Sequence, residues 1–186
     1  MMRRPDLIGK RWTSFAFPEY SYVSGRFPHP LREADGHGCR GPAAPDRAAI
    51  SDDWRDCQLY LWAIDLFHAG YYWEAHEAWE GIWHAAGRQG ELADLMKGLI
   101  KLAAAGVKAR EGRAEGVRRH AARAEALFAT VQDRLEQSEL WGLQLTQAGE
   151  LARQVAAGAD DLIRAASADV QAAILPGLPV RSAPTA

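Results

Sequence analysis

The sequence predicts an all-α protein, a compact bundle of about five helices with an extended N-terminal arm. Two observations lead to this fold class. From residue 51 onward, apolar residues recur three and four positions apart over stretches long enough for helices, and no stretch alternates apolar and polar residues as a half-buried strand does. Before residue 51, proline and glycine are too frequent for regular structure.

The length and charge of the chain limit the classes of function. Its 186 residues fit one domain with one core. The 22 lysines and arginines nearly balance the 24 aspartates and glutamates, and the formal charge of -2 predicts no binding to nucleic acid or to an anionic membrane. No apolar run approaches the roughly 20 residues of a membrane span, and the basic start lacks the apolar core of a signal peptide. Cys39 and Cys57 have no metal-binding spacing, so we expect free thiols and a cytoplasmic protein.

The N-terminal arm is assigned to residues 1–50, which hold six of the nine prolines. It also carries six aromatic residues, more than a solvated tail tolerates, so we expect part of it to pack on the helices. These residues are Trp12, Phe15, Phe17, Tyr20, Tyr22 and Phe27. The bundle is assigned to residues 51–168 and a flexible C-terminal tail to residues 169–186.

Five helices follow from the spacing of apolar residues and from the glycines between them. Ser51 and the aspartates after it predict an N-terminal cap for a first helix that ends near residue 69. The expected helices after it are 71–86, 91–110, 114–136 and 143–166. Small residues in the third helix, Gly98 with Ala103 or Gly106, predict close packing against the second. No strands are expected.

Residues 71–84, YYWEAHEAWEGIWH, combine aromatic rings with histidines and glutamates in one helix. At about 100° per residue, the rings of Tyr72, Trp79 and Trp83 fall on one apolar edge. The polar face beside that edge has Glu80 at its centre, with possible partners three or four positions away. Its members are His76, Glu77, Glu80 and His84, whereas Glu74 lies on the far side of the helix.

Three interpretations of this face stay open. It is a pocket in which indole rings and carboxylates bind a small molecule, and this is the function we expect first. It is the centre of a metal-dependent hydrolase that uses His76 and Glu80, although the HExxE spacing lacks the second histidine of the HExxH zinc motif. Or it is a polar cluster with a structural role only. From the sequence we assign no catalytic residue, metal or cofactor.

Other polar residues could join this face. Lys101 of the third expected helix either lies in a solvated stripe or pairs with Glu77 or Glu80. His29 and His37, in Pro/Gly turns of the arm, would reach Glu80 only if the arm crosses that face. The candidate pocket therefore consists of His76, Glu77, Glu80, Trp79, Trp83, Lys101, His29 and His37.

Two runs carry a family resemblance: LFHAGYYWEAHEAWEGIWH and LMKGLIKLAAAGVKAREGRAEGVRRHAARA. Together they are similar to the bacterial and archaeal family called domain of unknown function 309. The resemblance implies a compact all-helical bundle, assigns no activity, and gives His76, Glu77, Glu80 and Trp83 as signature positions. Tryptophan-rich helix surfaces also make a homodimer a partner to test, besides a small-molecule ligand.

Overall fold

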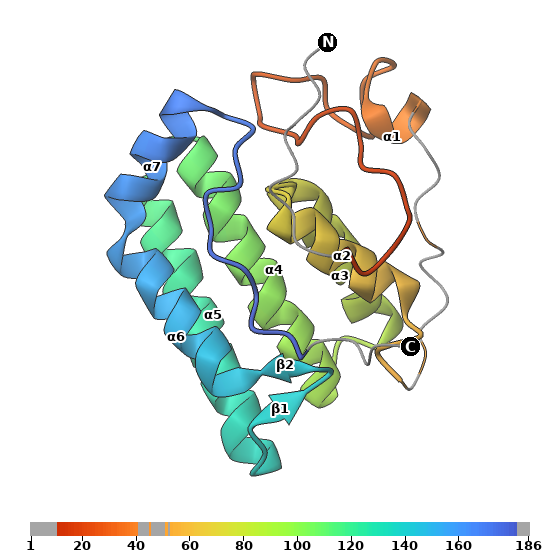
Figure 1. The fold of residues 1–186 in the computed structure, drawn as a ribbon, viewed down its shortest axis with the longest axis vertical. Coiled ribbons are helices and arrows are strands. Elements are labelled where there is room, and N and C mark those ends of the chain that lie inside the picture. Colours follow the sequence, from red (N-terminus) through yellow and green to blue (C-terminus); the bar gives the residue numbers. More distant parts are fainter. Residues whose placement is uncertain (1–10, 41–44, 46–50, 52, 182–186) are drawn as a thin grey trace.

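The computed structural model describes residues 11–40, 45, 51 and 53–181. Within them the chain is mostly helical, which confirms the all-α bundle (Figure 1). Consecutive helices pack as neighbours from α2 through α6. The elements in chain order are α1 (His37–Arg40), α2 (Gln58–His68), α3 (Tyr72–Ala85), α4 (Gly90–Arg110), α5 (Ala114–Leu135), β1 (Glu139–Leu140), β2 (Leu143–Gln144), α6 (Leu145–Ala157) and α7 (Ala159–Ala168).

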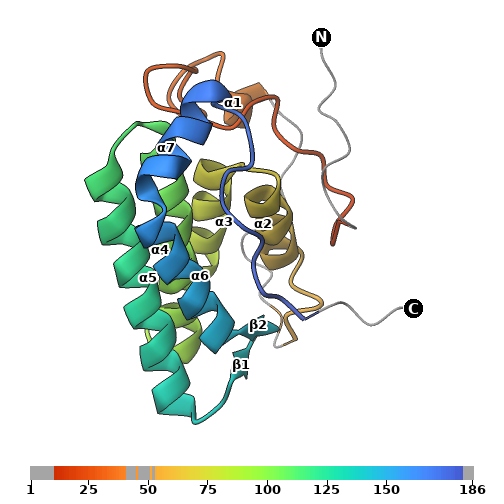
Figure 2. The ribbon, with the colours of Figure 1, turned by 60° about the vertical axis from the view of Figure 1, so that its left-hand side comes forward.

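Helix α2 is buried on all sides, since every residue from 59 to 67 is buried. A helix that is apolar on all sides needs cover on all sides. Helix α3 covers one side of α2. The arm and the C-terminal segment cover the others, and Figure 2 shows both running past α2 and α3 on the face away from α5.

The arm is attached to α2 and α3 at several points. Asp65 of α2 accepts hydrogen bonds from the backbone N–H groups of Trp12 and Thr13, both at 2.9 Å. The Tyr71 hydroxyl, just before α3, donates to the carbonyl of Pro18 at 3.0 Å. The ring of Trp12 meets that of Trp54 edge to face. Residues 1–10, 41–44 and 46–50 of the expected arm lie outside the described residues.

The segment after α7 also packs on the bundle. The hydroxyl of Tyr72 accepts hydrogen bonds from the N–H groups of Ile174 and Leu175, at 2.8 and 2.7 Å. Farther along, a β-bridge joins Val180 to Leu143 of β2. Residues 169–181 of the expected flexible tail thus run from the end of α7 to the small hairpin, and residues 182–186 lie outside the described residues.

Several local predictions were wrong. The arm was expected to lack regular structure, but it contains the short helix α1. The first expected helix begins at Gln58, with Cys57 at its N-cap, because residues 53–56 form turns and Ser51 caps only the N–H of Asp53. The last expected helix is divided at Gly158 into α6 and α7, in keeping with the low helix propensity of glycine. Before it stands the unexpected antiparallel hairpin β1–β2, which turns through Trp141 and Gly142 at positive φ.

The close helix approaches through glycine exist, but they involve two partners. A Cβ at Gly106 would lie 2.6 Å from the ring of Tyr72, so Gly106 brings α4 against α3 as expected. A Cβ at Gly98 would lie 2.4 Å from the ring of Phe128, so Gly98 packs against α5 and the prediction that it faces α3 was wrong. The two glycines therefore allow close packing of α4 against two of its neighbours, α3 and α5.

Candidate functional site

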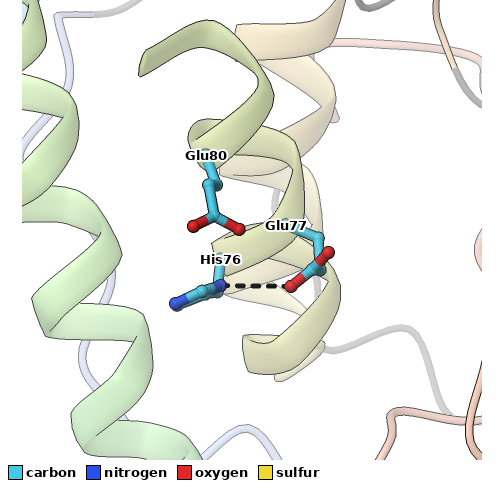
Figure 3. A group of neighbouring side chains, drawn as sticks. All are labelled: His76, Glu77 and Glu80. Atoms are coloured by element: carbon cyan, nitrogen blue, oxygen red, sulfur yellow. Dashed lines mark ion pairs between the residues drawn. The ribbon is translucent and has the colours of Figure 1, made fainter. Parts of the chain in front are cut away.

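Helix α3 brings His76, Glu77 and Glu80 together on its half-buried face. One ligand atom from each side chain lies within 4.8 Å of the other two. Nδ1 of His76 is 3.5 Å from Oε1 of Glu77, and these side chains are 27% and 23% exposed. Figure 3 shows the carboxylate of Glu80 directed toward the other two groups. Glu80 lies four residues after His76 and three after Glu77, so the helical spacing puts it beside both.

Within this group of three side chains, negative charge exceeds positive charge. Two carboxylates on neighbouring turns of one helix repel each other. The imidazole of His76 offers at most one positive charge. Its Nδ1 is buried and has no hydrogen-bond partner, because the 3.5 Å to Oε1 of Glu77 is longer than an ordinary hydrogen bond. A cation placed among the three side chains would therefore be attracted by both carboxylates and accepted by the imidazole.

The two tryptophans of the candidate pocket have different surroundings. Trp79 is fully buried, and its ring centroid is 5.8 Å from that of Phe67 in the core. Trp83 is half-buried, with the guanidinium of Arg88 at 5.4 Å and the ammonium of Lys97 at 5.8 Å from its ring centroid. Both indole rings therefore already have partners within this chain: Trp79 packs against Phe67, and Trp83 has cation–π contacts with Arg88 and Lys97.

His120 of α5 lies in the surroundings of His76 and was not among the predicted site residues. Burial is the main cause that lowers the pKa of His120, and nearby positive charges lower it further. Those charges are on Lys101, Arg119, Lys108 and His76, in order of effect. The sequence did indicate that His120 lies on the buried face of α5, because it is three residues after Val117 and four before Ala124, both of which are buried.

His84, also expected on this face, is exposed and accepts a hydrogen bond from Arg88 Nε at 2.9 Å. Of the two arm histidines, His29 accepts the N–H of Leu31 through Nδ1 at 3.2 Å and packs 5.8 Å from the ring of Trp73. Nε2 of His37 lies 2.8 Å from Oε1 of Glu74.

The contact of His37 with Glu74 is part of a buried polar network on the far side of α3. Oε1 of Glu74 also accepts the N–H of Tyr22 at 2.8 Å, and Oε2 lies 3.3 Å from the hydroxyl of Ser21. Arg110, at the end of α4, donates to the same hydroxyl. A carboxylate, not the histidine, stands in the middle, so the order differs from a Ser–His–acid triad and suits anchoring of the arm.

The far-side position of Glu74 was predicted from the helical spacing, but its burial was not. Only 4% of Glu74 is exposed, because the arm covers it. Two further polar residues, Asp65 and His68 of α2, hold the arm and the segment after α7 in the same way. Asp65 binds the arm, and Nε2 of His68 accepts the N–H of Leu178 at 2.9 Å.

The profile of the family described as Domain of unknown function (DUF309) matches residues 60–120. The resemblance noted in the sequence is therefore confirmed. The matched segment runs from Tyr60 in α2 to His120 in α5 and includes His76, Glu77 and Glu80. Comparison with curated proteins and with solved structures finds no match. Among the described residues, no helix combines the length and apolar character needed to cross a membrane.

Proposed function

We propose that this protein binds a divalent transition-metal ion through His76, Glu77 and Glu80. The observation that carries the proposal is the grouping of one nitrogen and two carboxylate oxygens within 4.8 Å of one another. Ligand atoms of one zinc ion lie about 2.0 to 2.2 Å from the metal and therefore about 3 to 3.5 Å from each other. Metal binding would require these three half-buried side chains to move closer together.

The donor types narrow the class of ion. Imidazole together with carboxylates suits zinc, manganese and ferrous iron, whereas calcium and magnesium prefer all-oxygen sites. A cation would also offset the repulsion between the two carboxylates. The proposal thus accounts for two acidic residues and a histidine on a face that is only half exposed to water.

Metal-dependent hydrolysis is the second candidate, and the ligand count favours it over a structural metal. Structural zinc sites are closed by four protein ligands, whereas catalytic sites keep a position for water. If His76, Glu77 and Glu80 are the only protein ligands, a metal bound there would keep such a position. A metal bound there would lower the pKa of its water and provide a nucleophile at neutral pH.

Binding of a small organic molecule between the tryptophans has less support. Trp79 is fully buried in the core, and the ring of Trp83 is bordered by Arg88 and Lys97. A cationic ligand would have to displace these side chains. A purely structural cluster remains the alternative that the experiment below separates from metal binding.

The test is metal content and metal affinity of the full chain produced without a polyhistidine tag. Elemental analysis of the purified protein is followed by titration of the chelator-treated protein with Co²⁺, Zn²⁺ and Mn²⁺. We expect one ion per chain, and a Co²⁺ spectrum without the thiolate charge-transfer band that Cys39 would produce. His76→Gln and Glu80→Gln are each expected to weaken the affinity by about tenfold or more.

His84→Gln is the matched control, since His84 lies on the same helix but is exposed and bonded to Arg88. It should bind the metal like the wild type. Equal affinity of His76→Gln and the wild type would refute the proposal. The absence of binding for all three ions would refute it too. In that case, a purely structural role of the cluster predicts that Glu80→Gln lowers the stability of the protein.

A further inference from the structure

A polar cavity of about 410 Å³ lies where α4 ends and α5 begins, beside the arm. Four of its seven lining residues are cationic, one is acidic, and Val23 alone is apolar. The cationic residues are Arg26 of the arm, Lys108 and Arg110 of α4, and Arg113 of the turn. In a chain with a formal charge of -2, this is a local excess of positive charge around an open volume.

Arg110 gives this cavity a positive charge that is held in place. The residue is 3% exposed and its guanidinium lies 4.7 Å from the ring centroid of Tyr72. It donates to the hydroxyl of Ser21 and, at 2.8 Å, to the carbonyl of Ala172. An arginine stays charged at any physiological pH. Its position is fixed by groups from the arm and from the segment after α7.

The acidic residue of the lining, Glu111, is paired with two of the cationic ones. Oε2 of Glu111 is 2.6 Å from Nζ of Lys108 and 3.5 Å from Nε of Arg113. A single carboxylate oxygen is thus held between two cationic side chains. An anion that enters the cavity meets the same two groups together with Arg26, which is exposed and comes from a separate segment.

We infer that this cavity binds a phosphate dianion, either free or as a small phosphomonoester. Arg26, Lys108 and Arg113 line it beside the buried Arg110, and phosphate has enough oxygens to accept hydrogen bonds from more than one of these groups at once. The cavity has no aromatic lining residue, so it offers no stacking surface for a base, and the phosphate group itself is what is recognised. Arg113 is the N-cap of α5, and the positive end of that long helix adds to the attraction.

The test is isothermal titration of the full chain with inorganic phosphate and with glycerol phosphate at constant ionic strength. Arg26→Gln and Arg113→Gln are each expected to weaken binding by about tenfold, because each removes a charge-assisted hydrogen bond. Glu111→Gln is expected to strengthen it several-fold, since the internal competitor for Lys108 and Arg113 is lost. Arg123→Gln, an exposed arginine of α5 outside the cavity, should leave it unchanged.

Binding of inorganic phosphate or of glycerol phosphate would support the inference, and the compound that binds more tightly shows which source of phosphate the cavity prefers. Succinate binding as tight as phosphate would overturn it, as would equal phosphate affinity in the wild type and Arg26→Gln. Arg26 is exposed, so this variant keeps the test valid even where Arg113→Gln impairs folding. His76→Gln should bind phosphate normally, which separates this site from the proposed metal site.

Discussion

Nε2 of His37 lies 2.8 Å from Oε1 of Glu74, and both side chains are buried. His37 belongs to the short helix α1 in the arm, and Glu74 belongs to the first turn of α3. The same carboxylate accepts the backbone N–H of Tyr22. Two points of the arm, 15 residues apart, therefore converge on a single glutamate, and that glutamate is the principal polar anchor of the arm on α3.

Glu74→Ala is expected to lower the free energy of unfolding by about 3 kcal/mol, because breaking a buried pair leaves the remaining polar partners without an acceptor. Glu115→Ala, an exposed glutamate in the first turn of α5, should change it by at most about 1 kcal/mol. Urea unfolding of both variants measures the difference. Similar stability of the two would mean that the arm is not held through Glu74.

Asp65→Asn tests the second anchor of the arm. Asp65 accepts the N–H of Trp12 on one oxygen and both the N–H and the hydroxyl of Thr13 on the other. Asparagine keeps one acceptor oxygen and presents an NH₂ group to donors, so we expect a loss of about 2 kcal/mol. Trypsin under native conditions should cut faster after Arg11. Asp133→Asn, exposed on α5, is the control and should be cut like the wild type.

Features of this structure that are local to one helix could be predicted from the sequence. The apolar spacing correctly predicted α3, α4 and α5 to within a residue or two, because each is a long helix with one clear buried face. It also grouped His76, Glu77 and Glu80, since that grouping is local to one helix. Whether the three bind a metal is a question that spacing does not answer.

The contacts that the sequence did not predict join residues far apart in the chain. The helical spacing put Glu74 on the far side of α3, but only the fold shows that the arm covers this side. For the same reason His37 was assigned to the face of Glu80 when it binds Glu74. The hairpin β1–β2 was missed because two-residue strands are too short to show an alternating pattern.

Gly106→Ala is expected to destabilise the protein by about 1 to 3 kcal/mol through overpacking. The added Cβ would stand 2.6 Å from the ring of Tyr72, and that ring is fully buried with its hydroxyl held by Ile174 and Leu175. Gly149→Ala in α6 is the matched control, since nothing lies within 4 Å of the added carbon. There the better helix propensity of alanine should stabilise by about 0.5 to 1 kcal/mol. Melting temperatures that move in opposite directions would bear out the prediction, and an unchanged value for Gly106→Ala would contradict it.

The attachment of the C-terminal segment to α2 is expected to depend on pH through His68. Burial lowers the pKa of His68, and the nearby Asp65 offsets part of this effect. The neutral ring accepts the N–H of Leu178 at Nε2, and a proton on that nitrogen would remove the acceptor. Because the folded state has the lower pKa, the unfolded chain binds more protons between the two pKa values. The stabilisation is therefore complete above the ordinary pKa of about 6.5 and is lost as pH falls from there through the lowered value.

Amide hydrogen exchange at Leu178 measures this local effect, with rates corrected for the intrinsic pH dependence of exchange. In the wild type the protection of this amide should fall as pH drops below about 6.5. His68→Gln keeps a side-chain oxygen that can accept a hydrogen bond and does not titrate, so its protection should stay nearly constant over the same range. His120→Gln is the control, because burial lowers the pKa of His120 too, but its ring has no part in the Leu178 contact. Both histidines contribute to the pH dependence of global unfolding, whereas only His68→Gln should flatten the curve at Leu178. Flattening by His120→Gln, or a pH-independent wild type, would show that His68 does not hold the segment.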